Sequence, residues 1–278
     1  MSNRQIAKRA SRFTVAVLAA GLASATLPKQ IMDPVMKTPP APNRPGPISL
    51  DALETLANQR RATRHFQATP PDRKVVERLL RIAQWAPSGF NLQPTRFVVV
   101  EDRSLRPALR WACMDQAQVE EAPLVVIFAG DRRAYENHFD AILSQERVAG
   151  TITESYAAQL RRIVPLMFSQ GPAGLGWLWK AVLIPLVRRF RPLPEMIAVH
   201  KRFWIAKQVM LSAMNFMLAA QAAGLNTSPM EGFDTGRLRK VLRLSRSLEP
   251  IVVVALGYGD PVLASKTRLP LEQVTSWR

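Results

Sequence analysis

Three short runs of β-branched and apolar residues constrain the fold of this chain most strongly. They are RFVVVED at 96–102, PLVVIFAGD at 123–131 and PIVVVALGYGD at 250–260. Each run is bounded by turn-forming or charged residues, which is the pattern of a strand buried in a sheet. With 278 residues, 47% of them hydrophobic, the chain is long enough to enclose such strands in a sizeable core.

Helical patterns alternate with these strands. Apolar residues recur at helical spacing in residues 49–61, 71–87, 105–116, 200–223 and 235–244. Ser49 is the expected N-cap of the first helix, and Gly224 ends the long fourth one. We find no internal repeat and no second complete core. The sequence therefore predicts one α+β domain over residues 48–278.

Residues 1–47 form a separate basic segment that closes in the Pro-rich stretch KTPPAPNRPGP, and they are predicted to be a tail followed by a linker. An apolar run at 13–27 contains the small residues of a secretory cleavage site at 23–25, so a targeting segment and a flexible basic arm both stay open. The segment has no twin-arginine pair of the kind that directs export of proteins folded around a cofactor. The predicted location is cytoplasmic, with export or membrane association through this segment as the alternative.

The charge balance favours anionic partners. The net charge of +17 comes from 38 Lys and Arg against 21 Asp and Glu, which suits nucleic acid, acidic lipid or a phosphorylated small molecule. Because the cations are dispersed and no recognition motif is present, no nucleic-acid partner is predicted. The single cysteine, Cys113, rules out a disulfide framework and is expected to be a buried apolar thiol. The three histidines lie far apart, so no metal site is predicted.

Four segments carry candidate chemistry: QRRATRHF at 59–66, APSGFNLQP at 86–94, SPMEGFD at 228–234 and SKTRLPLEQV at 265–274. The first and last are basic, so each is a phosphate clamp or a solvated charge run. The second is a loop between helix and strand whose small polar groups and amides can reach a planar heterocycle. In the third, Asp234 is also the expected N-cap of the following helix. Each segment is a weak signal alone.

In this order the four segments resemble the FMN-dependent NAD(P)H nitroreductase family, over about residues 49–275. The resemblance implies an α+β, three-layer fold in which a central mixed sheet is flanked by helices. It also implies an intertwined homodimer with one FMN at each subunit interface. Residues 48–278 would then be an FMN-binding domain, with a variable lid or insert at about 161–199.

The resemblance also implies a set of cofactor-binding residues. They are Arg60, Arg61, Ala62, Arg64, Ser88, Gly89, Asn91, Gln118, Pro229, Met230, Glu231, Gly232, Lys266 and Arg268. The cations of 60–64 and 266–268 would surround the phosphate and ribityl chain. The 88–91 loop and the 229–232 segment would lie along the isoalloxazine ring, with the Met230 side chain over a ring face. Gln118 would reach the pyrimidine edge.

Two departures from the family pattern bear on substrate preference rather than on FMN binding. Ala62 replaces a hydroxyl residue, and Thr95 stands where an aromatic residue often follows QP.

The activity implied by the resemblance is a ping-pong oxidoreduction. NADH or NADPH would reduce FMN at N5, and an electron-poor acceptor such as a nitroaromatic or a quinone would reoxidise it. No catalytic side chain is assigned, because the flavin carries the chemistry. The alternatives are a non-catalytic flavin- or membrane-binding protein on the same fold, and a flavoenzyme for another reductive reaction.

Residues 165–194 join an apolar, Trp-bearing stretch to three arginines. Lys180 and Pro185 interrupt the stretch, so it is not predicted to cross a membrane. A lid or dimer-contact helix and a helix lying on anionic lipid both stay open.

Overall fold

The structure is a computed structural model, and it describes residues 48–168, 176–190, 197, 200–259 and 266–278. The expected tail, targeting segment and linker at 1–47 lie outside these residues, as does part of the expected insert at 161–199.

The centre of the domain is an antiparallel sheet. Its strands are β1 (Thr95–Val100), β2 (Leu124–Asp131), β3 (Asn226–Met230) and β4 (Leu248–Gly257), and they lie in the order β1-β2-β4-β3. All three pairings are antiparallel. Within the described residues, parallel pairing is limited to an isolated bridge between Ala62 and Thr227. The expected mixed sheet is therefore antiparallel apart from this bridge.

The three predicted strands are confirmed as β1, β2 and β4, but β3 was not predicted. Its sequence, NTSPM, is polar and contains Pro229, which cannot donate a ladder hydrogen bond. The strand tolerates proline because it lies at the edge of the sheet.

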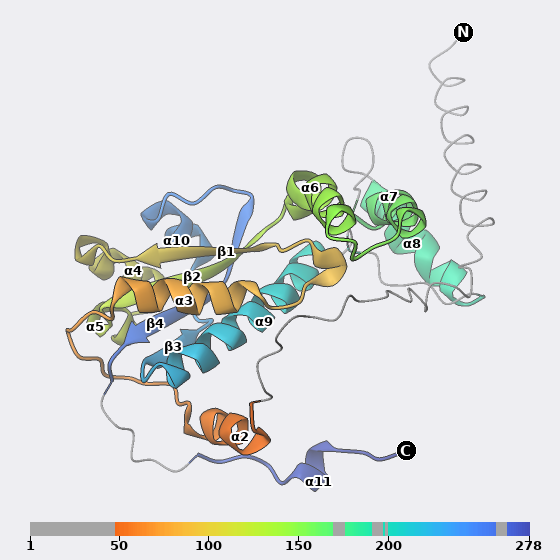
Figure 1. Cartoon of the computed structure of the whole chain (residues 1–278). Coiled ribbons are helices and arrows are strands. Elements are labelled where there is room, and N and C mark those ends of the chain that lie inside the picture. Colours follow the sequence, from red (N-terminus) through yellow and green to blue (C-terminus); the bar gives the residue numbers. More distant parts are fainter. Residues whose placement is uncertain (1–47, 169–175, 191–196, 198–199, 260–265) are drawn as a thin grey trace.

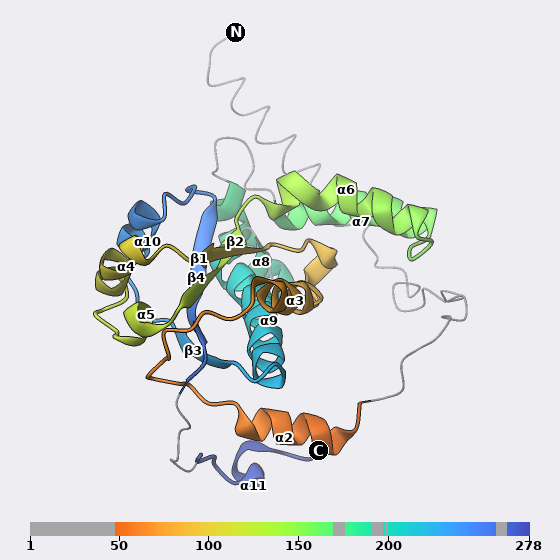
Figure 2. The ribbon, with the colours of Figure 1, turned by 60° about the vertical axis from the view of Figure 1, so that its left-hand side comes forward.

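Helices cover both faces of the sheet. They are α2 (Leu50–Gln59), α3 (Arg73–Gln84), α4 (Arg106–Ala112), α5 (Gln118–Glu121), α6 (Ala134–Val148), α7 (Glu154–Phe168), α8 (Gly176–Arg188), α9 (Lys201–Ala222), α10 (Thr235–Val241) and α11 (Leu271–Val274). Two short 3-10 turns, η2 (Gly89–Asn91) and η3 (Arg103–Leu105), flank β1. Figure 2 shows α3 and α9 on one side of the sheet and α4, α5 and α10 on the other. The three-layer α+β fold is thus confirmed.

The predicted helix starts are confirmed by their caps. The Ser49 hydroxyl accepts from the Ala52 N–H at 3.1 Å, and the Asp234 carboxylate accepts from the Arg237 N–H at 2.8 Å. Gly224, just after α9, has a φ of +72°, a conformation that glycine adopts without strain. Helices α6 and α7 were not predicted.

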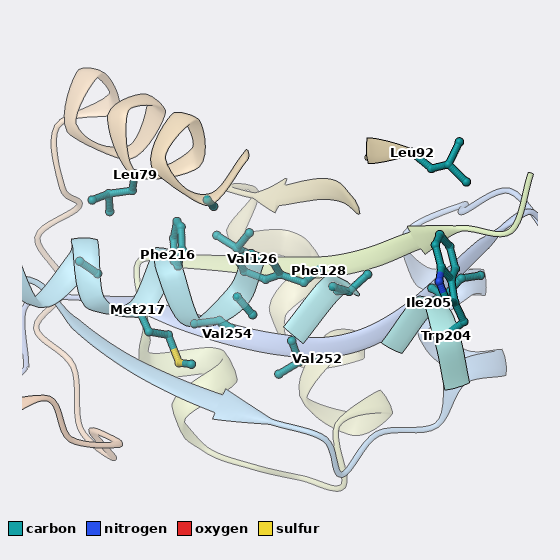
Figure 3. Close-up of a cluster of buried hydrophobic side chains, with 14 of the residues drawn as sticks. Leu79, Leu92, Val126, Phe128, Trp204, Ile205, Phe216, Met217, Val252 and Val254 are labelled. Atoms are coloured by element: carbon teal, nitrogen blue, oxygen red, sulfur yellow. The ribbon is translucent and has the colours of Figure 1, made fainter. Parts of the chain in front are cut away.

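The alternation of side chains along the strands builds one core on each face of the sheet. Val126 and Phe128 of β2 point toward α3 and α9, where they pack with Phe216 (Figure 3). Ile127 points the other way and packs with Leu238 of α10. Every residue of β2 is buried, as expected for a strand with helices on both sides.

Helix α9 is the core helix of the domain. Among the described residues it is the one helix long and apolar enough to cross a membrane by length and composition. Its residues Val209, Ala213 and Phe216 are nevertheless completely buried. Its apolar character on several sides is accounted for by packing against the sheet and against α3.

Candidate cofactor site

Four cationic side chains gather where the end of α2 meets the segment that leads into α11. Arg60 and Arg61 follow α2 directly, and Lys266 and Arg268 precede α11. The Lys266 Nζ donates a hydrogen bond to the Ala57 carbonyl oxygen at 2.7 Å, which joins the two parts of the chain. We call Arg60, Arg61, Lys266 and Arg268 the cation cluster.

The cation cluster lacks a counter-charge from the described residues. Burial lowers the pKa of Arg60, and the charges of Arg268 and Arg61 lower it further. The pKa of Lys266 is lowered as well, first by desolvation and then by the arginines of the cluster. No carboxylate in the described part of the chain forms an ion pair with any of the four.

One nitrogen atom of the cluster lacks a hydrogen-bond acceptor among the described residues. The Nη1 of Arg60 is buried and has no hydrogen-bond partner in the described structure. A buried guanidinium nitrogen without an acceptor is costly, and a bound anion would relieve both this cost and the mutual repulsion. The cluster therefore fits a phosphate group.

The backbone beside the cluster is fixed to the edge of the sheet. Ala62 bridges to Thr227 of β3, and the Thr63 N–H donates to the Thr227 carbonyl oxygen at 3.1 Å. The side-chain hydroxyls of Thr63, Thr227 and Ser228 are buried at this junction and have no partner among the described residues. These hydroxyls are further polar groups that packing leaves unsatisfied.

Arg64 stands apart from the cluster. Its side chain is exposed, and no contact within the described residues joins it to the other four cations. The next residue, His65, lies 3.2 Å from a carboxylate oxygen of Glu121. One chain thus brings together two of the three arginines predicted from this segment.

The segment 229–232 begins in β3 and ends in an exposed turn. Met230 is 3% exposed and packs with the core on the α4 and α10 side of the sheet. What this segment presents at the surface is therefore its turn, not the Met230 side chain. Glu231 and Gly232 are exposed. A Cβ added at Gly232 would lie 3.5 Å from the Gln116 Nε2, an ordinary contact, so packing within this chain does not require glycine there.

A pair of glutamines holds this turn in place. The Gln116 Nε2 donates to the Gly232 carbonyl oxygen at 2.9 Å and to the Cys113 carbonyl oxygen at 3.0 Å. The Gln118 Nε2 donates to the Gln116 Oε1 at 3.1 Å. Gln118 is 5% exposed, so in one chain it supports Gln116 rather than facing the surface.

The Ser88–Asn91 loop is held by the N-terminal part of α9. The Gly89 N–H donates to the Gln208 Oε1 at 2.9 Å. A Cβ on Gly89 would lie 3.1 Å from the Trp204 Nε1, so glycine permits this close approach. The loop is also tied to α6, because the Asn91 Nδ2 donates to the Glu146 Oε1 at 2.8 Å.

The loop carries backbone strain. Phe90, Asn91 and Gln93 have φ values of 56°, 50° and 46°, in the left-handed region that residues other than glycine seldom adopt. The Ser88 Oγ stabilises this conformation by accepting from the Gln93 N–H at 2.9 Å. Strain of this kind is concentrated at ligand-binding and catalytic sites.

A cavity of about 410 Å³ lies beside the loop, between α3, β1 and α9. Ser88, Gln93 and Gln208 contribute polar groups to its lining, and the volume falls in the usual range for small-molecule sites. No member of the cation cluster lines it. The loop follows the C-terminal end of α3, whereas the segment with the arginines approaches its N-terminal end (Figure 1). Twelve helical residues span about 18 Å, so the two parts of the predicted site are separate in one chain.

A family model described as the nitroreductase family matches residues 57–258. The chain belongs to the nitroreductase family. The family predicted from the four segments is thus confirmed.

Individual relatives match nearly the whole domain. The NADH dehydrogenase of Thermus thermophilus is 31% identical over 229 residues, which are 82% of this chain and 97% of that protein. The crystal structure of a nitroreductase-like protein from Streptococcus mutans superposes with a TM-score of 0.64 at 22% identity, covering 83% of this chain and all of that chain. A protein from Exiguobacterium sibiricum, solved in complex with FMN, gives a TM-score of 0.62 at 21% identity, covering 81% and 97%.

Several residues that shape this candidate site were not predicted. They are Gln116, Gln208, Trp204, Glu146 and the buried hydroxyl residues Thr63, Thr227 and Ser228. Each acts on a segment distant in sequence, or on the backbone of a neighbouring strand. No local pattern marks such residues, since a lone glutamine or threonine is equally common on an ordinary surface.

Proposed function

We propose that this protein is an FMN-dependent NAD(P)H oxidoreductase. The observation that carries the proposal is the cation cluster, in which four positive side chains meet without a carboxylate partner among the described residues. The terminal phosphate of FMN is a dianion whose oxygens match the donors of guanidinium groups. Membership of the nitroreductase family and the FMN complex of a protein with the same fold support this choice of ligand.

The rest of the cofactor would be held by backbone and small polar groups. The 229–232 turn, fixed by Gln116, and the unsatisfied hydroxyls of Thr63, Thr227 and Ser228 provide donors and acceptors next to the arginine segment. Because Gly232 is exposed and has no side chain, its backbone is open to the approach of a ligand.

We infer further that two chains complete each site. The Ser88–Asn91 loop and its cavity lie at the opposite end of α3 from the arginines, about 18 Å of helix away, so we assign the loop and the cation cluster of one chain to different flavins. In a twofold-symmetric dimer each surface meets its complement on the partner, so the loop of one chain can face the cation cluster of the other. The protein is therefore proposed to act as a homodimer with FMN at the interface.

When bound, FMN supplies hydride chemistry at N5, with NADH or NADPH as donor and an electron-poor nitroaromatic or quinone as the proposed acceptor. The residues of this chain bind the phosphate, fix the turn beside the ring and hold the strained loop. Positioning of the reactants is the protein's main contribution in such a site, and donor and acceptor would use it in turn, in a ping-pong sequence.

The visible absorption spectrum of the purified full chain tests this function. Flavin bands that bleach under anaerobic conditions on addition of NADH or NADPH, and return on addition of menadione or nitrofurazone, are the expected result. A chain that binds FMN but is reduced by neither nicotinamide would be a non-catalytic flavin protein. A chain that does not take up FMN at all would show that the cation cluster serves another anion.

A further inference from the structure

Helix α8 has two apolar faces, and the described structure covers only one of them. Ala181, Ile184 and Val187 are half-buried on the side toward the protein. Val182, Leu186 and Phe190 are 73%, 60% and 78% exposed. They follow one another at intervals of four residues, which places them on one side of the helix and of the turn that continues it. We call Val182, Leu186 and Phe190 the α8 face.

The α8 face is left without an apolar partner by the described residues. A helix that is apolar all round is normally buried on all sides, and large exposed apolar side chains are usually scattered singly rather than aligned. The turn after α8 is closed by hydrogen bonds from the Arg189 and Phe190 N–H groups to the Leu186 and Val187 carbonyl oxygens. This turn keeps Phe190 in line with the rest of the face.

The charge around α8 specifies the kind of partner. Residues 155–194 contain no Asp or Glu. Their cations are Arg161, Arg162, Lys180, Arg188, Arg189 and Arg191. Arg189 is exposed immediately beside Phe190. A bilayer containing anionic lipids has an apolar interior and negatively charged headgroups. An apolar stripe bordered by arginines is complementary to such a surface.

The length of α8 determines how it would meet a bilayer. Thirteen helical residues span about 20 Å, which is shorter than the hydrocarbon core of about 30 Å. The helix would therefore lie in the plane of the headgroups rather than cross the membrane. Trp177 and Trp179, residues of a type enriched at membrane boundaries, occur in its first turn in the sequence.

We propose that α8 docks this protein on an anionic lipid surface through Val182, Leu186 and Phe190, with Arg189 paired to lipid headgroups. A second copy that placed its own α8 against this one is the less suitable occupant, because it would bring the same carboxylate-free, cationic region against the first. Figures 1 and 2 show α8 well separated from α2, so docking through α8 leaves the cation cluster accessible.

A fluorescent probe placed on the α8 face tests the docking directly. Cys113, the single cysteine, is completely buried, so Leu186→Cys provides one accessible thiol for an environment-sensitive fluorophore such as NBD. The matched control is Val148→Cys at the end of α6, where the side chain is 89% exposed. Because the probe reports on its own surroundings, binding through residues 1–47 cannot imitate the signal.

With vesicles of phosphatidylcholine and phosphatidylglycerol, we expect a blue shift and stronger emission at position 186 and no change at position 148. The change should diminish with added salt and be absent with phosphatidylcholine alone. Arg189→Gln should weaken vesicle binding about fivefold, the effect of one basic residue near a negative membrane. Phe190→Ser should reduce the emission change at 186 while the circular dichroism spectrum stays the same.

Three results would overturn the docking proposal. The first is a probe at 186 that stays in an aqueous environment while the protein sediments with the vesicles. The second is an equal shift at 186 and 148, which would mean nonspecific adsorption. The third is a shift that appears without vesicles and grows with protein concentration, which would show that a second copy covers the α8 face.

Discussion

At the scale of single residues, Arg60 is a member of the cation cluster whose charge the described residues leave uncompensated. Its side chain is half-buried, its Nη1 lacks an acceptor, and Arg268 and Arg61 repel it. An uncompensated, partly buried charge destabilises the unliganded fold, and a bound anion would remove this destabilisation. Arg60 should therefore matter more for anion binding than for folding.

Replacing Arg60 by Gln should weaken FMN binding about 10- to 100-fold, because a charge-assisted hydrogen bond contributes about 1.5–3 kcal/mol. Flavin fluorescence quenching on titration of the apoprotein measures the effect. The apoprotein itself should be no less stable, since the substitution removes a repelled charge. Arg246→Gln is the control, because Arg246 is exposed on the loop between α10 and β4. Equal losses in both variants would mean that the cation cluster has no special role.

The ionisation of the Cys113 thiol is disfavoured because the side chain is buried. Burial raises the pKa of its thiol from 9.0 to about 11. The folded state thus retains the proton that the unfolded state releases first. The sign of the linkage follows: stability is intact below about pH 9 and falls as the pH rises toward 11.

Urea unfolding at several pH values tests this effect. The free energy of unfolding should decline by up to about 3 kcal/mol more in the parent protein than in Cys113→Ala between about pH 9 and 11. The native thiol should also react slowly with Ellman's reagent at neutral pH. Fast reaction before unfolding would show that the thiol is accessible.

At the scale of elements, β2 and α9 pack so closely at Gly130 that no side chain fits between them. A Cβ added at Gly130 would lie 2.0 Å from the Ile205 Cγ2 and 3.2 Å from the Val209 Cγ2. The strand and the helix that carries Gln208 and Trp204 can therefore approach only because position 130 has no side chain. This contact positions the end of α9 that supports the Ser88–Asn91 loop.

Gly130→Ala should lower the free energy of unfolding by about 1–3 kcal/mol through overpacking. Thermal unfolding of the variant measures the loss. In an Ile205→Ala background, which removes the obstructing methyl group, the cost of Gly130→Ala should nearly vanish. An unchanged cost in that background would mean that contact with Ile205 is not its cause.

At the scale of the whole molecule, the two parts of the candidate site lie apart in one chain. The cation cluster lies near α2 and the segment before α11, and the strained loop with its cavity lies at the far end of α3 (Figure 1). This division makes the proposed homodimer testable by complementation, since each site would use one part from each chain.

Arg60→Gln combined with Arg61→Gln impairs the first part, and Asn91→Tyr, at an exposed position, obstructs the second. Each variant alone should bind FMN poorly. Co-expression should restore about a quarter of the sites, because half of the dimers are mixed and each mixed dimer has one intact site. Flavin content per chain and light scattering measure the outcome. No recovery from mixed dimers that do form would place each site within one chain.

Much of the fold could be predicted because its signals are local. The strands at 95–100, 124–131 and 248–257 are apolar and β-branched, and the starts of α2 and α10 carry side-chain caps. Strand β3 could not be recognised, since an edge strand with a proline and polar residues has no strand pattern. Helices α6 and α7 were also missed, and Pro165 lies inside α7, where a proline normally ends a helical pattern.

The charged and glycine-bearing segments of the candidate site could be predicted from the sequence. The residues that hold these segments in place could not. Arg60, Lys266 and the 229–232 turn stand in sequence motifs. The roles of Gln116 and Gln208 depend on hydrogen bonds across 116 and 119 positions of the chain, which no motif encodes. Met230 shows the opposite case, because the alternation along β3 directs its side chain into the core and away from the role its motif implied.

The sequence by itself determined the family, the α+β class and the positions of the three central strands, because hydrophobic patterns and short motifs act over a few neighbouring residues. Only the tertiary structure decided which cations meet, which glycine separates a strand from a helix and which face of α8 is left uncovered. Such features arise when segments far apart in the chain pack together, and the burial and charge of each side chain then depend on neighbours that local sequence does not specify.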